Sequence, residues 1–186
     1  MQRLPEGLKE KLCTWYDAGH RDLPWRQDRE PYHVWLSEIM LQQTRVEAVK
    51  GYYARFLTEL PTIAALEDCP PDRLTKLWEG LGYYNRVRNM QKAAVTVTEE
   101  YDGVLPADYG KLLELKGIGS YTAGAIASIA YGIPVPAVDG NVLRILTRVA
   151  TDDTDIMKQS FRSAVEAQLG EMMRELTVPE ELRRAL

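Results

Sequence analysis

The sequence contains no long apolar run, few cysteines and no excess of positive charge. A membrane-spanning helix needs about 18 uncharged apolar residues in a row, and no segment approaches that length, so we expect no membrane partner. The first six residues carry charge with no apolar segment behind it, which predicts no signal peptide and a cytoplasmic location. The formal net charge of −4 excludes a protein that coats nucleic acid through bulk positive charge.

The few side chains that bind metals well are widely separated. Cys13 and Cys69 form no CxxC pair, and two thiolates cannot hold an iron–sulfur cluster or a tetrahedral zinc ion by themselves. His20 and His33 have no second ligand at a useful spacing, so we interpret both as surface residues. The sequence therefore predicts no metal site and no cofactor.

The composition is that of a globular protein, with 45% hydrophobic and 27% charged residues among 186. This length allows one compact unit or two small lobes that share a cleft. Helical periodicity dominates and strand alternation is scarce, so the sequence predicts an all-α fold. Its first helix carries an apolar stripe of Leu8, Leu12, Trp15 and Tyr16. We expect helices over 6–18, from 31 onward, and over 44–60, 62–67, 72–79, 85–101, 121–130, 141–149 and 158–175, with a last one starting in a capping box at 177–180.

The segment from Lys111 to Ala130 has the pattern of a helix–hairpin–helix. The end of one helix is followed by a turn with two glycines, Gly117 and Gly119, and then by a helix of small residues. We expect both glycines to adopt backbone angles closed to other residues. The amides of such a turn and of the next helix can approach a phosphate group closely. The alternative is a simple turn between two helices.

Two carboxylates stand out by their surroundings. Glu38 lies three residues after Trp35 and three before Leu41, near an apolar helix face where a carboxylate must be paired or protonated. Asp139 directly precedes the helix expected from Asn141. That position fits a helix cap, and it also fits a carboxylate that faces a cleft opposite Glu38.

Together these motifs resemble those of a known family. The segments Leu115–Ala123 and Val138–Asn141 resemble the helix–hairpin–helix (HhH-GPD) superfamily of DNA base-excision glycosylases. The segments Leu23–Arg26, Pro31–Thr44 and Trp78–Tyr84 are most similar to its members that remove adenine mispaired with 8-oxoguanine or guanine. The resemblance implies a glycosylase fold of two helical lobes around a cleft, and duplex DNA containing a mispaired adenine as the partner.

The resemblance also implies roles for four residues. Glu38 would be the general acid that protonates the adenine ring, and Asp139 would stabilise the cationic sugar with help from Asn141 and Tyr121. This division suits the chemistry, because an oxocarbenium-like state needs one protonated and one ionised carboxyl group. Members that cut the strand through a Schiff base carry a lysine where Tyr121 stands, so the resemblance implies a monofunctional hydrolase.

Further residues match positions that contact DNA or the extruded base. Trp25, Arg26 and Leu41 match the base pocket, and Gln43 and Tyr83 match residues that enter the base stack. For Tyr83, an ordinary half-buried aromatic is the alternative. The residues expected near the DNA backbone are Gly117, Gly119, Ser120, Arg86 and Arg88, where the two arginines alternatively form a solvated helix face.

The resemblance covers about residues 15–149 and implies a division into lobes. Residues 25–136 would form a six-helix module with the helix–hairpin–helix, and residues 1–24 with 137–186 a second lobe. After Met157 the family's four cluster cysteines and its C-terminal recognition domain have no counterpart, so we expect a short form with weak preference for 8-oxoguanine. We expect a monomer. The alternatives are an inactive DNA-binding protein of this fold and an endonuclease III-like glycosylase for oxidised pyrimidines.

Overall fold

The computed structural model describes residues 3–174, and every regular element in this range is helical. The all-α prediction is therefore confirmed, whereas the helix expected from residue 177 lies outside the described residues. The elements are α1 (Leu8–Gly19), η1 (Pro24–Arg26), α2 (Pro31–Leu41), α3 (Val46–Glu59), α4 (Ile63–Glu67), α5 (Pro71–Leu77), α6 (Asn85–Tyr101), α7 (Tyr109–Glu114), α8 (Ser120–Ala125), the π-helical turn η2 (Ile126–Ala130), α9 (Gly140–Val149) and α10 (Gln159–Arg174).

Local sequence explains where several of these helices begin. Pro31 is the first residue of α2 and Pro71 that of α5, where the missing N–H costs nothing. Thr62 caps α4 by accepting a hydrogen bond from the Ala65 N–H at 3.1 Å. Asp108 caps α7 in the same way, at 2.9 Å from the Lys111 nitrogen. For α2, α4 and α5 these signals place the helix starts within one residue of the sequence-based expectation, whereas the start of α7 was not predicted from the sequence.

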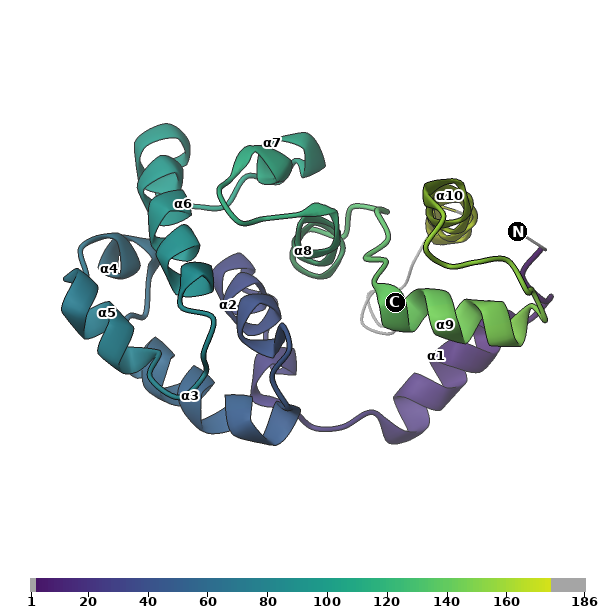
Figure 1. The fold of residues 1–186 in the computed structure, drawn as a ribbon, viewed down its shortest axis with the longest axis horizontal. Coiled ribbons are helices and arrows are strands. Elements are labelled where there is room, and N and C mark those ends of the chain that lie inside the picture. Colours follow the sequence, from purple (N-terminus) through teal and green to yellow (C-terminus); the bar gives the residue numbers. More distant parts are fainter. Residues whose placement is uncertain (1–2, 175–186) are drawn as a thin grey trace.

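The buried apolar residues form two separate clusters. The larger cluster lies between Leu23 and Ala127 in the sequence and contains Trp35, Phe56 and Trp78, which are fully buried. The smaller cluster contains Leu4, Val138, Leu143, Leu146, Ala150, Phe161 and Val165. In Figure 1, α3, α4, α5 and α6 lie at one end of the molecule and α1, α9 and α10 at the other, with α2 and α8 between. We propose that the two clusters are the cores of the two expected lobes.

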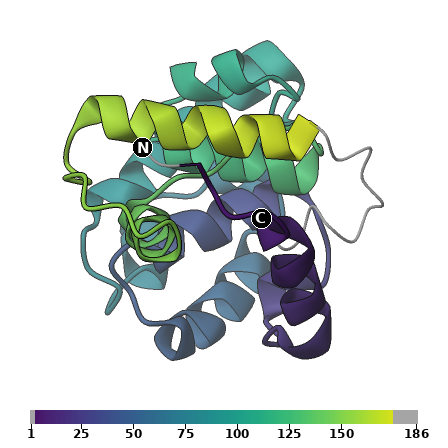
Figure 2. The same ribbon diagram turned by 90° about the vertical axis from the view of Figure 1, so that its right-hand side faces the viewer.

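The N-terminal segment contacts α10, the last helix among the described residues. The Leu4 N–H donates to Oε1 of Gln168 on α10 at 3.1 Å. Figure 2 shows α10 running across the upper part of this face, above α9 at the left and α1 at the lower right. Across residues 3–174, no helix combines the length and apolar character that crossing a membrane requires.

Candidate active site

Glu38 is an acidic residue on a helix whose residues are mostly apolar and buried. Its neighbours on α2 include Trp35, Leu36 and Met40, all fully buried. Burial raises the pKa of Glu38 above its ordinary value, and the negative charge of Asp139 raises it further. A hydrogen bond from Tyr121 and the positive charge of Arg26 act in the opposite direction. Because burial dominates, the Glu38 carboxyl holds its proton to a higher pH than an exposed glutamate.

Tyr121 reaches Glu38 from the second helix of the helix–hairpin–helix. It is the second residue of α8, and its side chain is half-buried. Burial raises the pKa of Tyr121 well above its usual range, and the neighbouring Glu38 carboxylate adds to this effect. The phenol therefore keeps its proton and remains a hydrogen-bond donor to Glu38.

Asp139 is the N-terminal cap of α9. Its Oδ1 accepts hydrogen bonds from the N–H groups of Asn141 at 2.9 Å and Val142 at 2.8 Å, and its Oδ2 accepts one from Nδ2 of Asn141 at 2.9 Å. The same carboxylate is near enough to Glu38 to act on its pKa. The sequence left open whether Asp139 caps the helix or acts as a carboxylate opposite Glu38. The two roles are compatible, because the cap hydrogen bonds fix where the carboxylate lies.

A cavity of about 580 Å³ opens beside Glu38 and Tyr121. The three residues expected in a base pocket, Trp25, Arg26 and Leu41, all line it. Asp139 and Asn141 are not among its lining residues. Several further residues line the cavity that the sequence motifs did not assign to a base pocket, among them Tyr16, Leu23, Ser37 and Val46.

Trp15 differs from its expectation. The apolar stripe of the first helix places it in a core, but its side chain is 65% exposed and lines the same cavity. Tyr16, the next residue, is buried and lies under the Arg26 guanidinium, with 5.5 Å between the guanidinium carbon and the ring centre. Helical periodicity cannot separate a cavity wall from a core, because both require apolar residues on one helix face.

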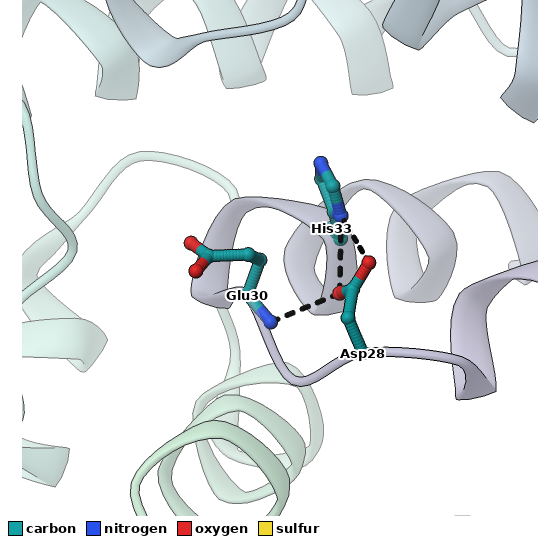
Figure 3. A network of polar contacts seen from close by, with 3 residues as sticks. All are labelled: Asp28, Glu30 and His33. Carbon is teal, nitrogen blue, oxygen red and sulfur yellow. Dashed lines mark hydrogen bonds and ion pairs between the residues drawn. The ribbon is translucent and has the colours of Figure 1, made fainter.

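The loop before α2 is tied to that helix by Asp28 (Figure 3). Its carboxylate accepts a hydrogen bond from the Glu30 N–H at 3.0 Å and lies 2.9 Å from Nδ1 of His33 in the first turn of α2. Asp28 also lines the cavity. This network links one cavity wall to the helix that carries Glu38.

Of the two glycines in the hairpin between α7 and α8, only Gly117 has the special backbone conformation that we expected. Gly117 has a φ of +83°, a conformation that favours glycine, and a Cβ there would lie 2.8 Å from Cβ of Asn89. Gly119 has a φ of −94° and caps α8 in an extended conformation open to any residue, so its expected special backbone angle is wrong. Gly119 and Ser120 are exposed, and their role in DNA binding stays a prediction.

The two residues expected to enter the base stack lie at exposed turns. Gln43 follows the end of α2 and Tyr83 precedes α6, and the Tyr83 side chain is 66% exposed. Both have positive φ angles, 56° and 46° respectively. Exposure agrees with the expected role of each side chain and argues against a half-buried packing role for Tyr83.

Of the two arginines on α6, only Arg88 is exposed as expected. The Arg86 guanidinium instead lies against five main-chain carbonyl oxygens at 2.7–3.3 Å. The structure contradicts the expected contact of Arg86 with the DNA backbone, because its terminal nitrogens are occupied within the protein. The position of Arg86 on a helix face does not indicate which main-chain carbonyl groups its side chain will contact.

The cysteines do not provide a metal site in the part of the chain that the structure describes. Cys13 lies on α1 and Cys69 in the larger hydrophobic cluster, and both are buried free thiols. Nowhere in residues 3–174 do three or more histidine, cysteine or acidic side chains gather to bind a metal ion. A cluster held by four thiolates does not fit these residues.

Comparison with known proteins places the chain in a family. The profile of the HhH-GPD superfamily base excision DNA repair proteins matches residues 36–171. The chain therefore belongs to that superfamily, as the sequence motifs indicated.

Within the superfamily, the chain is similar to adenine DNA glycosylases. It is 45% identical to that of Rattus norvegicus over 157 residues, which cover 80% of this chain and 30% of the relative. It is 42% identical to that of Buchnera aphidicola from Baizongia pistaciae, over 75% of this chain and 40% of the relative. For the relative from Mycolicibacterium smegmatis the identity is 40%, over 78% and 50%. The chain thus spans half or less of the length of these relatives.

Solved structures show the same fold. A thermostable thymine-DNA glycosylase superimposes with a TM-score of 0.76 at 24% identity, covering 91% of this chain and 85% of the other. A non-covalent endonuclease III–DNA complex gives a TM-score of 0.73 at 23% identity, covering 95% and 80%. The expected helix–hairpin–helix glycosylase fold is confirmed.

Proposed function

We propose that the protein is a monofunctional DNA glycosylase that hydrolyses the N-glycosidic bond of adenine mispaired with 8-oxoguanine or guanine in duplex DNA. The observation that carries this proposal is the Glu38 carboxyl beside a cavity, with a pKa raised by burial and with Tyr121 and Asp139 as neighbours. Similarity to adenine DNA glycosylases over three quarters or more of the chain supports the choice of base.

In the proposed mechanism, Glu38 begins as the acid. Its proton passes to a ring nitrogen of the extruded adenine, which makes the base a better leaving group. The bond between the base and C1′ then breaks through an oxocarbenium-like state whose positive charge Asp139 stabilises. Water adds to C1′ and loses a proton, which the Glu38 carboxylate is placed to accept.

The hydrogen bonds around Asp139 suit it to its part in this mechanism. Three donors from Asn141 and Val142 hold the carboxylate in one orientation, so it need not reorganise as charge develops on the sugar. Tyr121 holds Glu38 through the hydrogen bond that it donates from α8. We assign Asn141 and Tyr121 to positioning these two carboxyl groups.

The residues around the cavity favour hydrolysis over strand cleavage. A Schiff base requires an amine at the reacting carbon, and no lysine is among the described residues that line the cavity. The rival assignment to an endonuclease III-like glycosylase needs such an amine. We therefore propose that the chain releases the base and leaves the strand intact.

We propose duplex DNA as the partner, bound through local geometry rather than net charge. The exposed hairpin at Gly117, Gly119 and Ser120 offers backbone N–H groups, and Arg88 adds a positive charge on the neighbouring helix α6. Structural neighbours include endonuclease III complexes with DNA. The monomeric state, the cytoplasmic location and the weak preference for 8-oxoguanine stay predictions.

Base release from a duplex with one adenine opposite 8-oxoguanine tests the proposal. We expect adenine in the supernatant and alkali-labile sites in the strand, with no covalent adduct after borohydride treatment. A trapped adduct on oxidised pyrimidine substrates would instead support the endonuclease III-like alternative. Salt-dependent duplex binding without release of any base would identify an inactive DNA-binding protein.

A further inference from the structure

Two exposed residues hold a backbone conformation that their side chains disfavour. Gln43 and Tyr83 have φ angles of 56° and 46°, in the left-handed region that is costly for residues other than glycine. Such conformations persist where the surrounding structure enforces them. Because both side chains are exposed, burial of the side chains in a core does not supply that constraint.

One constraint acts at the end of α2. The last carbonyl groups of a helix lack partners within the helix. Nη1 of Arg86 lies 2.7 Å from the Ile39 oxygen, 3.3 Å from the Met40 oxygen and 2.7 Å from the Gln42 oxygen. The Gln42 carbonyl belongs to the peptide group that directly precedes Gln43, so this contact fixes one side of the left-handed residue.

The same guanidinium also binds the turn that contains Tyr83. Nη2 of Arg86 lies 3.1 Å from the Leu81 oxygen and 3.2 Å from the Gly82 oxygen. The Gly82 carbonyl belongs to the peptide group that directly precedes Tyr83, and it also accepts a hydrogen bond from Nε1 of Trp78 at 3.0 Å. The guanidinium carbon lies 5.7 Å from the centre of the Tyr83 ring.

We propose that Arg86 is a positioning residue that holds Gln43 and Tyr83 at a fixed separation, so that both enter the duplex together when a base is extruded. This inference rests on the proposed function, in which these two side chains fill or wedge the base stack. Only a planar group with donors pointing in two directions spans both turns. A lysine ammonium is a single point charge and cannot reach both sets of carbonyls in the same way.

Extrusion of a base tests the proposal without requiring catalysis. A duplex with 2-aminopurine in place of the target adenine becomes more fluorescent when that base leaves the stack. We expect Arg86→Lys to lower the equilibrium constant for extrusion by at least about tenfold, the effect of losing charge-assisted hydrogen bonds. Arg73→Lys, at an exposed arginine on α5 that pairs with Glu59 and lies outside the proposed DNA contacts, is the control and should stay within about twofold of the parent.

A second background separates positioning from general damage to the fold. When Gln43 and Tyr83 are both replaced by alanine, Arg86→Lys should change extrusion by less than about twofold, since coupled residues share one effect. An equal loss in both backgrounds would mean that Arg86 acts only on stability and would overturn the proposal. Parent-level extrusion by Arg86→Lys would overturn it as well.

A double-mutant cycle of Gln43 and Tyr83, with Arg86 in place, tests the coupling of these two residues even if Arg86→Lys does not fold. Gln43→Ala, Tyr83→Ala and the double variant should show non-additive losses in extrusion, because one anchor couples the two residues. Additive losses would refute a shared anchor. If neither single variant changes extrusion, the assignment of the two wedge residues in the proposed function fails. If both change it and Arg86→Lys does not, only the present inference fails.

Discussion

Replacing Tyr121 by phenylalanine should shift the pH dependence of base release upward. In the proposed mechanism Glu38 acts as an acid, so the rate is full below the pKa of Glu38 and falls as the pH rises through it. The hydrogen bond from Tyr121 favours the ionised form of Glu38 and lowers its pKa. Without the hydroxyl group, Glu38 keeps its proton to a higher pH.

The size of the shift follows from the lost hydrogen bond. A hydrogen bond to a charged group contributes about 1.5–3 kcal/mol. A difference of about 1.4 kcal/mol between protonation states corresponds to one pH unit. The midpoint of the falling limb should therefore move up by about one pH unit or somewhat more.

The assay is a single-turnover pH profile of adenine release, with enzyme in excess over duplex. The plateau is expected to fall too, since Tyr121 positions Glu38, so the midpoint and not the plateau is the quantity that tests the prediction. Tyr101→Phe, on α6 and away from the cavity, is the matched control and should leave the midpoint unchanged. Asp139→Asn removes a negative neighbour of Glu38 and should move the midpoint down. A midpoint that stays in place in Tyr121→Phe would refute the assignment of Glu38 as the titrating acid.

Three further predictions concern stability and the helix cap. Gly124→Ala places a Cβ 2.7 Å from the Pro136 oxygen, so the free energy of unfolding measured with denaturant should fall by about 1–3 kcal/mol. The Cβ that Gly51→Ala adds has no neighbour within 4 Å, so this control should not be destabilised. Asp139→Ala removes the cap of α9, so the free energy of unfolding should fall by about 1 kcal/mol, and most of the base release should be lost as well. An unchanged free energy of unfolding would contradict the role of Asp139 as a cap. Phe161→Ala empties the smaller cluster and should cost about 3–5 kcal/mol, and a value below about 1 kcal/mol would show that this cluster is not a core.

Local signals allowed much of the fold to be predicted. Prolines at first helical positions and side-chain caps depend only on nearby residues, so Pro31 and Asp139 predicted the starts of α2 and α9. The helix 85–101 coincides with α6 because its apolar period is strong and glycines precede it. The family fold followed from the combination of motifs rather than from any single one.

What the sequence could not predict depends on contacts between distant segments. Arg86 binds carbonyl groups more than forty positions away at the end of α2 and directly after it, and nothing near Arg86 in sequence indicates this. Trp15 has the period of a core residue but lines the cavity, because the facing elements come from another part of the chain. The π-helical turn η2 was expected as a continuation of an α-helix, since its residues, Ile126–Ala130, have ordinary helical character.

The most direct test of the central claim is a comparison of Glu38→Gln with the parent protein on the duplex with adenine opposite 8-oxoguanine. Glutamine keeps the size of the side chain but cannot donate the proton that the departing base needs. Single-turnover base release should fall by about 100-fold or more, while the dissociation constant for the duplex should stay nearly the same. Release at the parental rate by Glu38→Gln would contradict the account.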